Sequence, residues 1–146
     1  MSKIVADTSV IINGQLIDQI EAGSVRNSEI IIPQAVFDEL QSQASSKKEQ
    51  GFVGLEKIKK LKELSGGFGL NVVTKGPHPS IDDIKFASSG RIDALITDVA
   101  KENDAILYTS DNVQYLVAQA KGLETVFLQP IVKNETLEFL KFFDDQ

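Results

Sequence analysis

Four acidic residues stand at points where apolar runs stop or helices begin. Asp7 directly follows the apolar run 4–6, and Asp111 follows the run 105–109. Glu39 and Asp93 lie near the starts of two further predicted helices. In an open parallel sheet, ligands bind beyond the carboxyl ends of the strands. If the two strands that end near Asp7 and Asp111 are neighbours, both acids face one crevice.

Clustered carboxylates repel one another, and burying them without partners is costly. A divalent cation with oxygen ligands removes that cost, and Mg²⁺ commonly binds carboxylates together with phosphate and water. Such sites catalyse metal-assisted hydrolysis of phosphodiester bonds. A more modest role also fits Asp7, because Asp is a favoured helix N-cap. Thr8 and Ser9 are likewise candidates to cap the helix that follows.

Composition narrows the metal chemistry. The chain has 146 residues, no cysteine and one histidine, His78, which lies between two prolines and is interpreted as structural. Thiolate sites, disulfides and histidine-rich zinc sites are therefore excluded. Oxygen ligands point to Mg²⁺ or Mn²⁺. No apolar run approaches the length of a membrane span and no signal peptide is recognisable, which predicts a cytoplasmic protein without a membrane partner.

Charge is unevenly distributed along the chain. The net charge of −6 argues against a broad electrostatic grip on nucleic acid. A local basic segment nevertheless stands out, in which lysines outnumber glutamates between residues 47 and 62. It is either a solvated helix face or a guide for a phosphate backbone. The residues that would guide a nucleic acid are Lys47, Lys48, Lys57, Lys60 and Arg91.

Apolar periodicity predicts strands that alternate with helices. The predicted strands cover residues 4–6, 29–32, 68–74, 105–109 and 125–128. The predicted helices cover residues 10–21 (with a break near 13–14), 34–44, a basic segment ending at 64, 91–103 and 113–121. This alternation predicts an α/β fold with parallel strands and helices on both faces of the sheet. We expect one domain over 1–129 and an amphipathic tail or helix over 130–146, with Leu137, Leu140 and Phe143 on one face.

Four motifs, taken together and in order, resemble a PIN domain. They are Val-Ala-Asp7-Thr-Ser, Ile-Ile-Pro33-Gln-Ala-Val-Phe-Asp-Glu39-Leu, Gly90-Arg-Ile-Asp93-Ala-Leu-Ile and Leu-Tyr-Thr109-Ser-Asp111. The match extends from the N-terminus to about Leu128. The run from Gly51 and the segment from Ile92 are similar to the N-terminal PIN domain of archaeal ATPases that contain PIN and KH domains.

The resemblance implies a three-layer α/β/α fold with a parallel sheet of about five strands in the order 3-2-1-4-5. It implies an endoribonuclease that cuts single-stranded RNA, RNA being favoured over DNA, at a Mg²⁺ or Mn²⁺ site. Asp7, Glu39, Asp93 and Asp111 match the acidic metal-binding and catalytic positions. Asp98, Ser9 and Thr109 are possible additional site residues. A homo-oligomer and an ATPase portion of a longer chain are the implied protein partners.

Two other functions compete with that of a nuclease. One is a PIN module that serves assembly or nucleic-acid handling in a larger ATPase or nucleic-acid machine, with weak or no cleavage. The other is a phosphatase or phosphotransfer domain on a similar scaffold. The sequence opposes the second, because Asp7-Thr8-Ser9 lacks the second acid of an Asp-x-Asp phosphatase loop.

Overall fold

The computed structural model describes residues 1–87 and 90–129. Its elements, in chain order, are β1 (Ser2–Ala6), α1 (Thr8–Ile12), α2 (Gln15–Glu21), β2 (Ser28–Pro33), α3 (Gln34–Ser45), α4 (Glu49–Leu64), β3 (Asn71–Lys75), α5 (Ile81–Lys85), α6 (Arg91–Glu102), β4 (Ile106–Thr109), α7 (Asn112–Ala120) and β5 (Thr125–Phe127). Strands and helices alternate as the sequence predicts. The predicted amphipathic tail, residues 130–146, lies outside the described residues.

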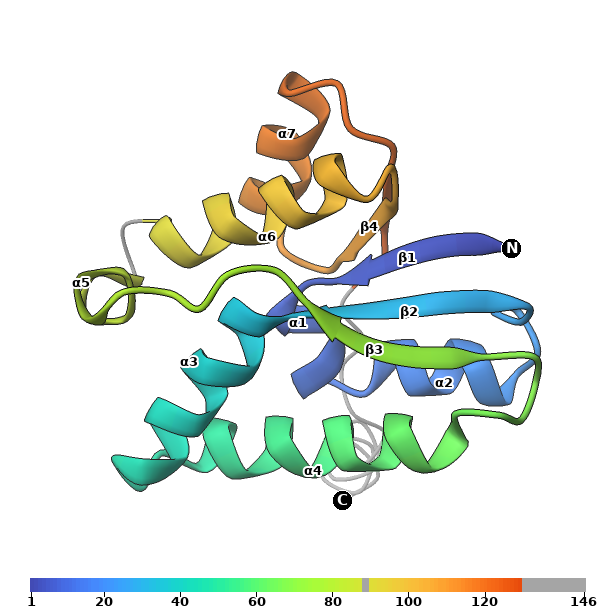
Figure 1. Ribbon diagram of the computed structural model, residues 1–146, viewed down its shortest axis with the longest axis horizontal. Helices are drawn as coiled ribbons and strands as arrows, with labels where there is room; N and C mark the ends of the chain where they lie inside the picture. The colour runs from blue at the N-terminus through green and yellow to red at the C-terminus, as the bar shows by residue number, and fades with distance from the viewer. Residues whose placement is uncertain (88–89, 130–146) are drawn as a thin grey trace, which may run out of the picture.

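All strands of the sheet are parallel, in the order β3-β2-β1-β4-β5 (Figure 1). The predicted α/β fold and strand order are therefore confirmed. The central strands are apolar on both faces, and Ile30, Ile31 and Ile32 of β2 are fully buried. Such runs suit a sheet covered by helices on each side. Helices α6 and α7 lie on one side in Figure 1, and α2 and α4 on the other.

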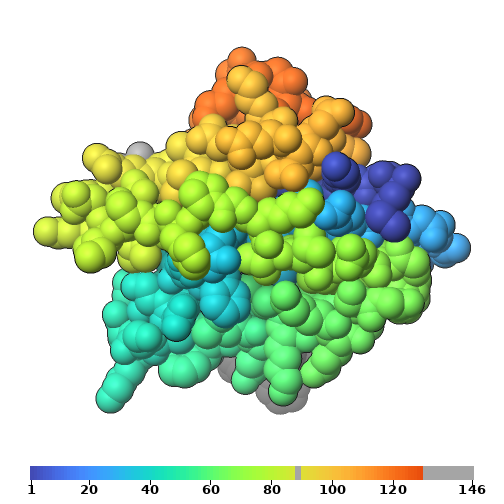
Figure 2. All heavy atoms as spheres, viewed as in Figure 1, coloured from blue at the N-terminus to red at the C-terminus, as the bar shows by residue number. Residues whose placement is uncertain are grey.

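The order in which strands are added to the sheet reverses at β1. Strands β2 and β3 follow β1 on one side, and β4 and β5 lie on its other side. The chain crosses from β3 to β4 through α5 and α6, and its first part runs across the face of the molecule seen in Figure 2. Ligands of open α/β sheets bind at such a switch point. Across the described residues, no helix is both long and apolar enough to span a bilayer.

Helix α4 packs closely on α3 because two of its residues have no side chain. Gly51 and Gly54, which the sequence marks as helix-weakening, lie inside α4 and are buried. A Cβ atom on Gly51 would lie 2.7 Å from the Leu40 carbonyl oxygen, and one on Gly54 would lie 2.5 Å from Leu40 Cδ2. Close packing between the two helices thus offsets the low helix propensity of glycine.

We expect Gly51→Ala to destabilise the protein by about 1–3 kcal/mol, because the new methyl group meets backbone atoms that cannot turn away. Urea unfolding followed by circular dichroism measures this change. Gly67→Ala is the matched control, since its Cβ would have Leu64 O at 3.4 Å as its nearest neighbour. Equal unfolding midpoints for the two variants would contradict the proposed close packing.

Candidate metal centre

Strands β1 and β4 are neighbours, and this pairing brings Asp7 and Asp111 to one edge of the sheet. Ala6 pairs with Tyr108, and the Asp7 amide donates to the Tyr108 carbonyl at 3.0 Å. Asp7 follows β1, and Asp111 follows β4 by two residues. The carboxyl ends of two adjacent parallel strands therefore present both acids, as the sequence predicts for neighbouring strands.

The Asp7 carboxylate is buried, with 3% of the residue exposed. Its Oδ2 atom accepts hydrogen bonds from Ser9 Oγ at 2.6 Å and from Thr109 Oγ1 at 2.8 Å. Its Oδ1 atom is buried and has no hydrogen-bond partner among the described residues. One oxygen of this carboxylate is thus held in place, and the other is left as an unsatisfied buried acceptor, which costs free energy.

Both strand-end aspartates are helix N-caps as well. Asp7 caps α1 and accepts from Ser9 N, and Asp111 caps α7 through Oδ1, which accepts from Val113 N at 2.8 Å. The prediction that Thr8 and Ser9 cap α1 is wrong. Both residues already lie in the first turn of α1, because the chain becomes helical directly after Asp7. Capping fixes the turn that aims each carboxylate.

Glu39 on α3 and Asp93 on α6 complete the group. Burial, and then the charges of Asp93 and Asp7, raise the pKa of Glu39 to about 7. Burial, and then the charges of Asp7 and Asp111, raise the pKa of Asp93 to about 6. Burial also raises the pKa of Asp7, against its hydrogen bonds to Ser9 and Thr109 and together with the charge of Asp111. Carboxyl groups from four separate elements therefore share one electrostatic environment.

The four acids are not assembled as a closed ligand cage. Within residues 1–87 and 90–129, no three Asp, Glu, His or Cys side chains are close enough to hold one ion together. Repulsion between like charges favours such separation of the four carboxylates. Glu39 also has a partner of its own, since Gln43 Nε2 donates to Glu39 Oε1 at 3.2 Å.

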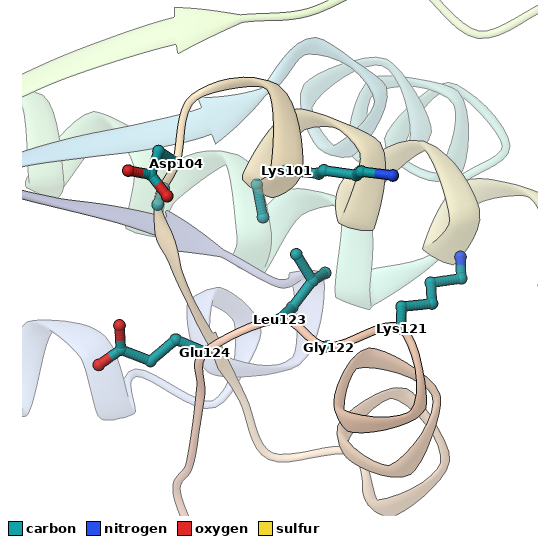
Figure 3. A pocket seen from close by; sticks show the side chains of 8 residues that line it. Lys101, Asp104, Lys121, Gly122, Leu123 and Glu124 are labelled. Atoms are coloured by element: carbon teal, nitrogen blue, oxygen red, sulfur yellow. The ribbon is translucent and has the colours of Figure 1, made fainter.

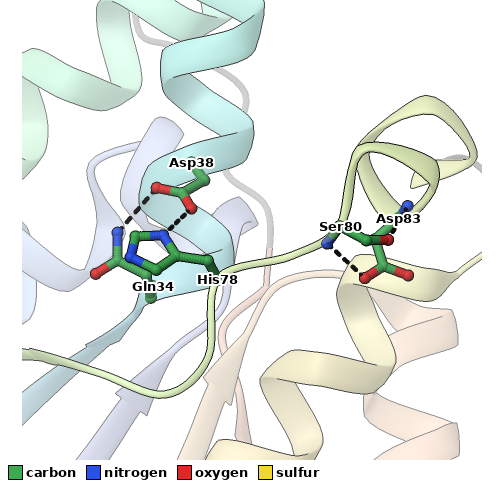
Figure 4. A network of polar contacts seen from close by, with 5 residues as sticks. All are labelled: Gln34, Asp38, His78, Ser80 and Asp83. Carbon is green, nitrogen blue, oxygen red and sulfur yellow. Dashed lines mark hydrogen bonds and ion pairs between the residues drawn. The ribbon is translucent and has the colours of Figure 1, made fainter.

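Asp38, the neighbour of Glu39, has a different role. It accepts hydrogen bonds from Gln34 Nε2 at 2.8 Å and from His78 Nδ1, so it connects α3 with the loop after β3 (Figure 4). The same figure shows the capping box of Ser80 and Asp83, which begins α5. Asp38 is thus bound to the loop, and Glu39 is the acid of this pair whose pKa is raised by the charges of Asp93 and Asp7.

The hydroxyl groups of Ser9 and Thr109 orient the Asp7 carboxylate. Ser9 Oγ also accepts from Ser110 N at 2.9 Å, and Thr109 Oγ1 accepts from Asp111 N at 3.0 Å. Each hydroxyl therefore links the α1 side of the site with the loop after β4. Whether either one also contacts a ligand stays a prediction.

We expect Thr109→Val to lower the free energy of unfolding by about 1–3 kcal/mol, because it leaves the Asp111 amide without its acceptor. The two side chains have similar shapes, so the change isolates the hydroxyl. Chemical denaturation at constant pH measures the loss. Thr125→Val on β5 is the control, since that hydroxyl donates only to the Leu123 carbonyl. An equally large loss in the control would contradict the assigned role of Thr109.

The remaining predicted residues are dispersed. Asp98 is exposed on α6 and contributes to none of the raised pKa values.

Arg91 lies 3.8 Å from Asp83, with its guanidinium over the Phe86 ring. Lys60 of α4 pairs with Glu21 of α2 at 3.1 Å. The exposed Lys47 and Lys48 precede α4, and Lys57 approaches Gly14 at the start of α2. Their role in nucleic-acid binding stays a prediction.

Sequence reasoning missed the buried polar side chains around the acids. Gln114 of α7 is 1% exposed and Gln15 of α2 is 8% exposed. Asn13 Nδ2 donates to Gln15 Oε1 at 2.6 Å and to Ser110 Oγ at 2.8 Å, which joins the start of α2 to the loop after β4. A glutamine on the inward side of an otherwise apolar helix is the signal that could have revealed Gln114.

A surface hollow lies elsewhere. It has a volume of about 320 Å³ and is lined by the ends of α6 and α7, with Lys101, Asp104, Lys121 and Glu124 around it (Figure 3). The carboxyl ends of helices lie at the opposite edge of a parallel sheet from the carboxyl ends of its strands. The hollow is therefore remote from the four acids.

Comparison with known proteins gives three consistent matches. The family model described as "PIN domain" matches residues 4–120. An uncharacterized KH and PIN-domain containing protein of Methanocaldococcus jannaschii is 40% identical over 144 residues, which are 99% of this chain and 22% of that protein. A solved domain of a functionally unknown protein from the same organism has a TM-score of 0.84 and 40% identity, and the match covers 92% of this chain and 96% of that domain.

Proposed function

The chain belongs to the PIN domain family, and we propose that it is a metal-dependent endoribonuclease that hydrolyses phosphodiester bonds of single-stranded RNA. Asp7, Glu39, Asp93 and Asp111 form the proposed centre, with Mg²⁺ or Mn²⁺ as the cofactor. Family membership supports a nuclease fold, and the four carboxylates support metal-dependent hydrolysis.

The buried Oδ1 atom of Asp7 is the observation that carries this proposal. Natural proteins rarely leave a buried polar atom without a partner. This one belongs to a carboxylate that three other carboxyl groups approach closely enough to couple with it electrostatically. A cation beside Asp7 would satisfy the unpaired oxygen and remove the repulsion among the acids.

The available donors fit Mg²⁺ or Mn²⁺. All four candidate ligands are carboxylates, which are hard oxygen donors. The whole chain has no cysteine, and its one histidine is paired with Asp38. Ligands of the kind that structural zinc requires are thus not available at this site.

Asp7, Glu39 and Asp93 have distinct parts in the proposed reaction. A divalent ion held by these carboxylates would supply activation of water and neutralisation of phosphate charge. Asp7 would be the central ligand, because Ser9 and Thr109 hold one of its oxygens and leave the other available. The pKa values of Glu39, about 7, and of Asp93, about 6, are raised, and binding an ion would favour the deprotonated form of both.

The test is cleavage of an end-labelled single-stranded RNA by purified protein in Mn²⁺, in Mg²⁺ and in EDTA. We expect cleavage that depends on the metal and is absent in EDTA, with no comparable cleavage of the same sequence as double-stranded RNA. The pattern of end-labelled fragments separates internal cuts from trimming at the ends. Protein that binds Mn²⁺ but cuts no RNA in either metal would overturn the proposal.

A second proposal is favoured by the length of the KH and PIN-domain relative, of which this chain spans only 22%. Here the chain serves as a nucleic-acid-handling or assembly module within a larger protein, such as an ATPase, with little cleavage of its own. Metal-independent RNA binding without cleavage would support this role. Under either proposal, selection from a random pool of single-stranded RNA would give the sequence preference.

A further inference from the structure

Gln114 occupies an unusual place for a glutamine. It is one of the largest fully buried side chains of the protein, on the inward face of α7. It also stands three residues after the N-cap Asp111, where a glutamine usually reaches back to the backbone amide of the cap. Here the Asp111 amide donates to Thr109 Oγ1 instead. The Gln114 side chain is thereby free to point toward another element.

That element is α6, at the residue that carries a candidate metal ligand. Gln114 Nε2 donates to the backbone carbonyl of Asp93 at 3.1 Å. The backbone amide of Gln114 also donates to Asp111 Oδ1 at 3.3 Å. One buried residue therefore holds the backbone of one acid and the carboxylate of another.

We propose that Gln114 is a positioning residue that sets the distance between Asp93 and Asp111 and so prepares the metal centre. Its effect on metal binding rests on the proposed function. The hydrogen bond to Asp93 uses the main-chain carbonyl, so it takes up neither oxygen of the Asp93 carboxylate. A neutral amide also adds no positive charge that would compete with a cation for the acids.

The like charges of the site make such a connection necessary. Asp93 and Asp111 repel each other, and they lie near the first turns of two different helices. Gly90, the N-cap of α6, adopts a left-handed conformation and provides no side-chain cap to the helix that carries Asp93. Fixing the Asp93 carbonyl to α7 keeps Asp93 from moving away from Asp111 before any ion is bound. Outer-shell partners of this kind typically change metal affinity 10–100-fold.

The protein offers a matched control for this role. Lys121 Nζ donates to Thr97 Oγ1 at 3.0 Å and also joins α7 with α6. This contact lies at the other end of α7, beside the hollow in Figure 3. Gln114→Met and Lys121→Met each remove one hydrogen bond between the same two helices, but only the first removes a bond to one of the four acids.

The deciding experiment measures Mn²⁺ affinity by titration calorimetry, with no RNA present. We expect Gln114→Met to weaken Mn²⁺ binding about tenfold and Lys121→Met to change it less than about twofold. Gln114→Asn is the second variant, because it keeps a buried amide but is too short to reach the Asp93 carbonyl. Hydrogen exchange without metal is a separate readout, in which the amides at the start of α6 should exchange faster in both Gln114 variants than in Lys121→Met.

Each outcome is informative. Wild-type affinity in both folded Gln114 variants, or equal weakening in Lys121→Met, overturns the positioning role. Tight Mn²⁺ binding by a wild-type protein that cuts no RNA overturns the nuclease but not the role of Gln114. A wild-type protein that binds no Mn²⁺ overturns the metal centre and this role with it.

Discussion

Asp7→Asn should abolish metal-dependent RNA cleavage, with a loss of more than about 100-fold in kcat/KM. Loss of an outer-shell partner alone typically costs 10–100-fold, and Asp7 is proposed as the central ligand. The amide keeps one oxygen to accept from Ser9 and Thr109, so the turn after β1 should survive. The change replaces the unsatisfied Oδ1 atom with an NH₂ group that binds metal ions poorly.

The same variant should fold at least as well as the wild type when no metal is present. Removing a buried charge relieves its desolvation cost, which is the main reason that the pKa of Asp7 is raised. Cleavage assays and urea unfolding of the same preparation therefore give opposite responses. Asp18→Asn, on the exposed side of α2, is the control and should change neither quantity. Retained cleavage in Asp7→Asn would remove this residue from the centre.

Stability of the metal-free protein should fall as the pH rises from about 5 to 8. Glu39 and Asp93 have folded-state pKa values of about 7 and about 6, above the ordinary values of 4.5 and 3.8. The folded protein therefore keeps protons that the unfolded chain releases. This contribution is fully present below the unfolded-state pKa and is lost as the pH rises through the folded-state pKa.

The expected loss is about 2–3 kcal/mol. A shift of one pKa unit corresponds to about 1.4 kcal/mol, and solvent screening of these half-buried groups reduces the full value. Mn²⁺ should reverse the trend and stabilise the protein most at pH 8, because its ligands must be deprotonated. At an ion concentration 100 times the dissociation constant, the gain is about 2.7 kcal/mol.

Thermal unfolding with and without Mn²⁺ across this pH range measures both effects. Glu39→Gln is the informative variant, since it removes the carboxyl group whose pKa is raised to about 7 and should flatten the metal-free profile. Sodium chloride at equal ionic strength controls for general screening. A metal-free protein that becomes more stable between pH 5 and 8 would contradict the assigned environment of the acids.

Much of the local structure can be predicted from the sequence. The runs around Ile4–Ala6 and Ile30–Ile32 are apolar on both faces, and this pattern is enough to predict buried parallel strands. The same local pattern places Asp7 and Asp111 after strands, and Glu39 and Asp93 in helices. The strand order came from the resemblance to a family, because apolar periodicity does not say which strands are neighbours.

Other features could not be read locally. The glycines of α4 look like helix breakers in sequence, but packing against Leu40 of α3 explains them. Asp38 and Glu39 are adjacent acids that the sequence does not distinguish. In the structure, the Asp38 carboxylate binds His78 of the loop after β3. These outcomes depend on contacts between residues that are far apart in the chain.

The sequence by itself determined the strands, the helices and the four acids that follow or begin them, because hydrophobic periodicity and turn chemistry act over a few residues. Only the tertiary structure decided that Asp7 Oδ1 is buried without a partner among the described residues, and that Gln114 turns away from its own cap to Asp93. The physical reason is that burial and charge coupling arise when separate elements pack, and no single stretch of the chain contains both sides of such a contact.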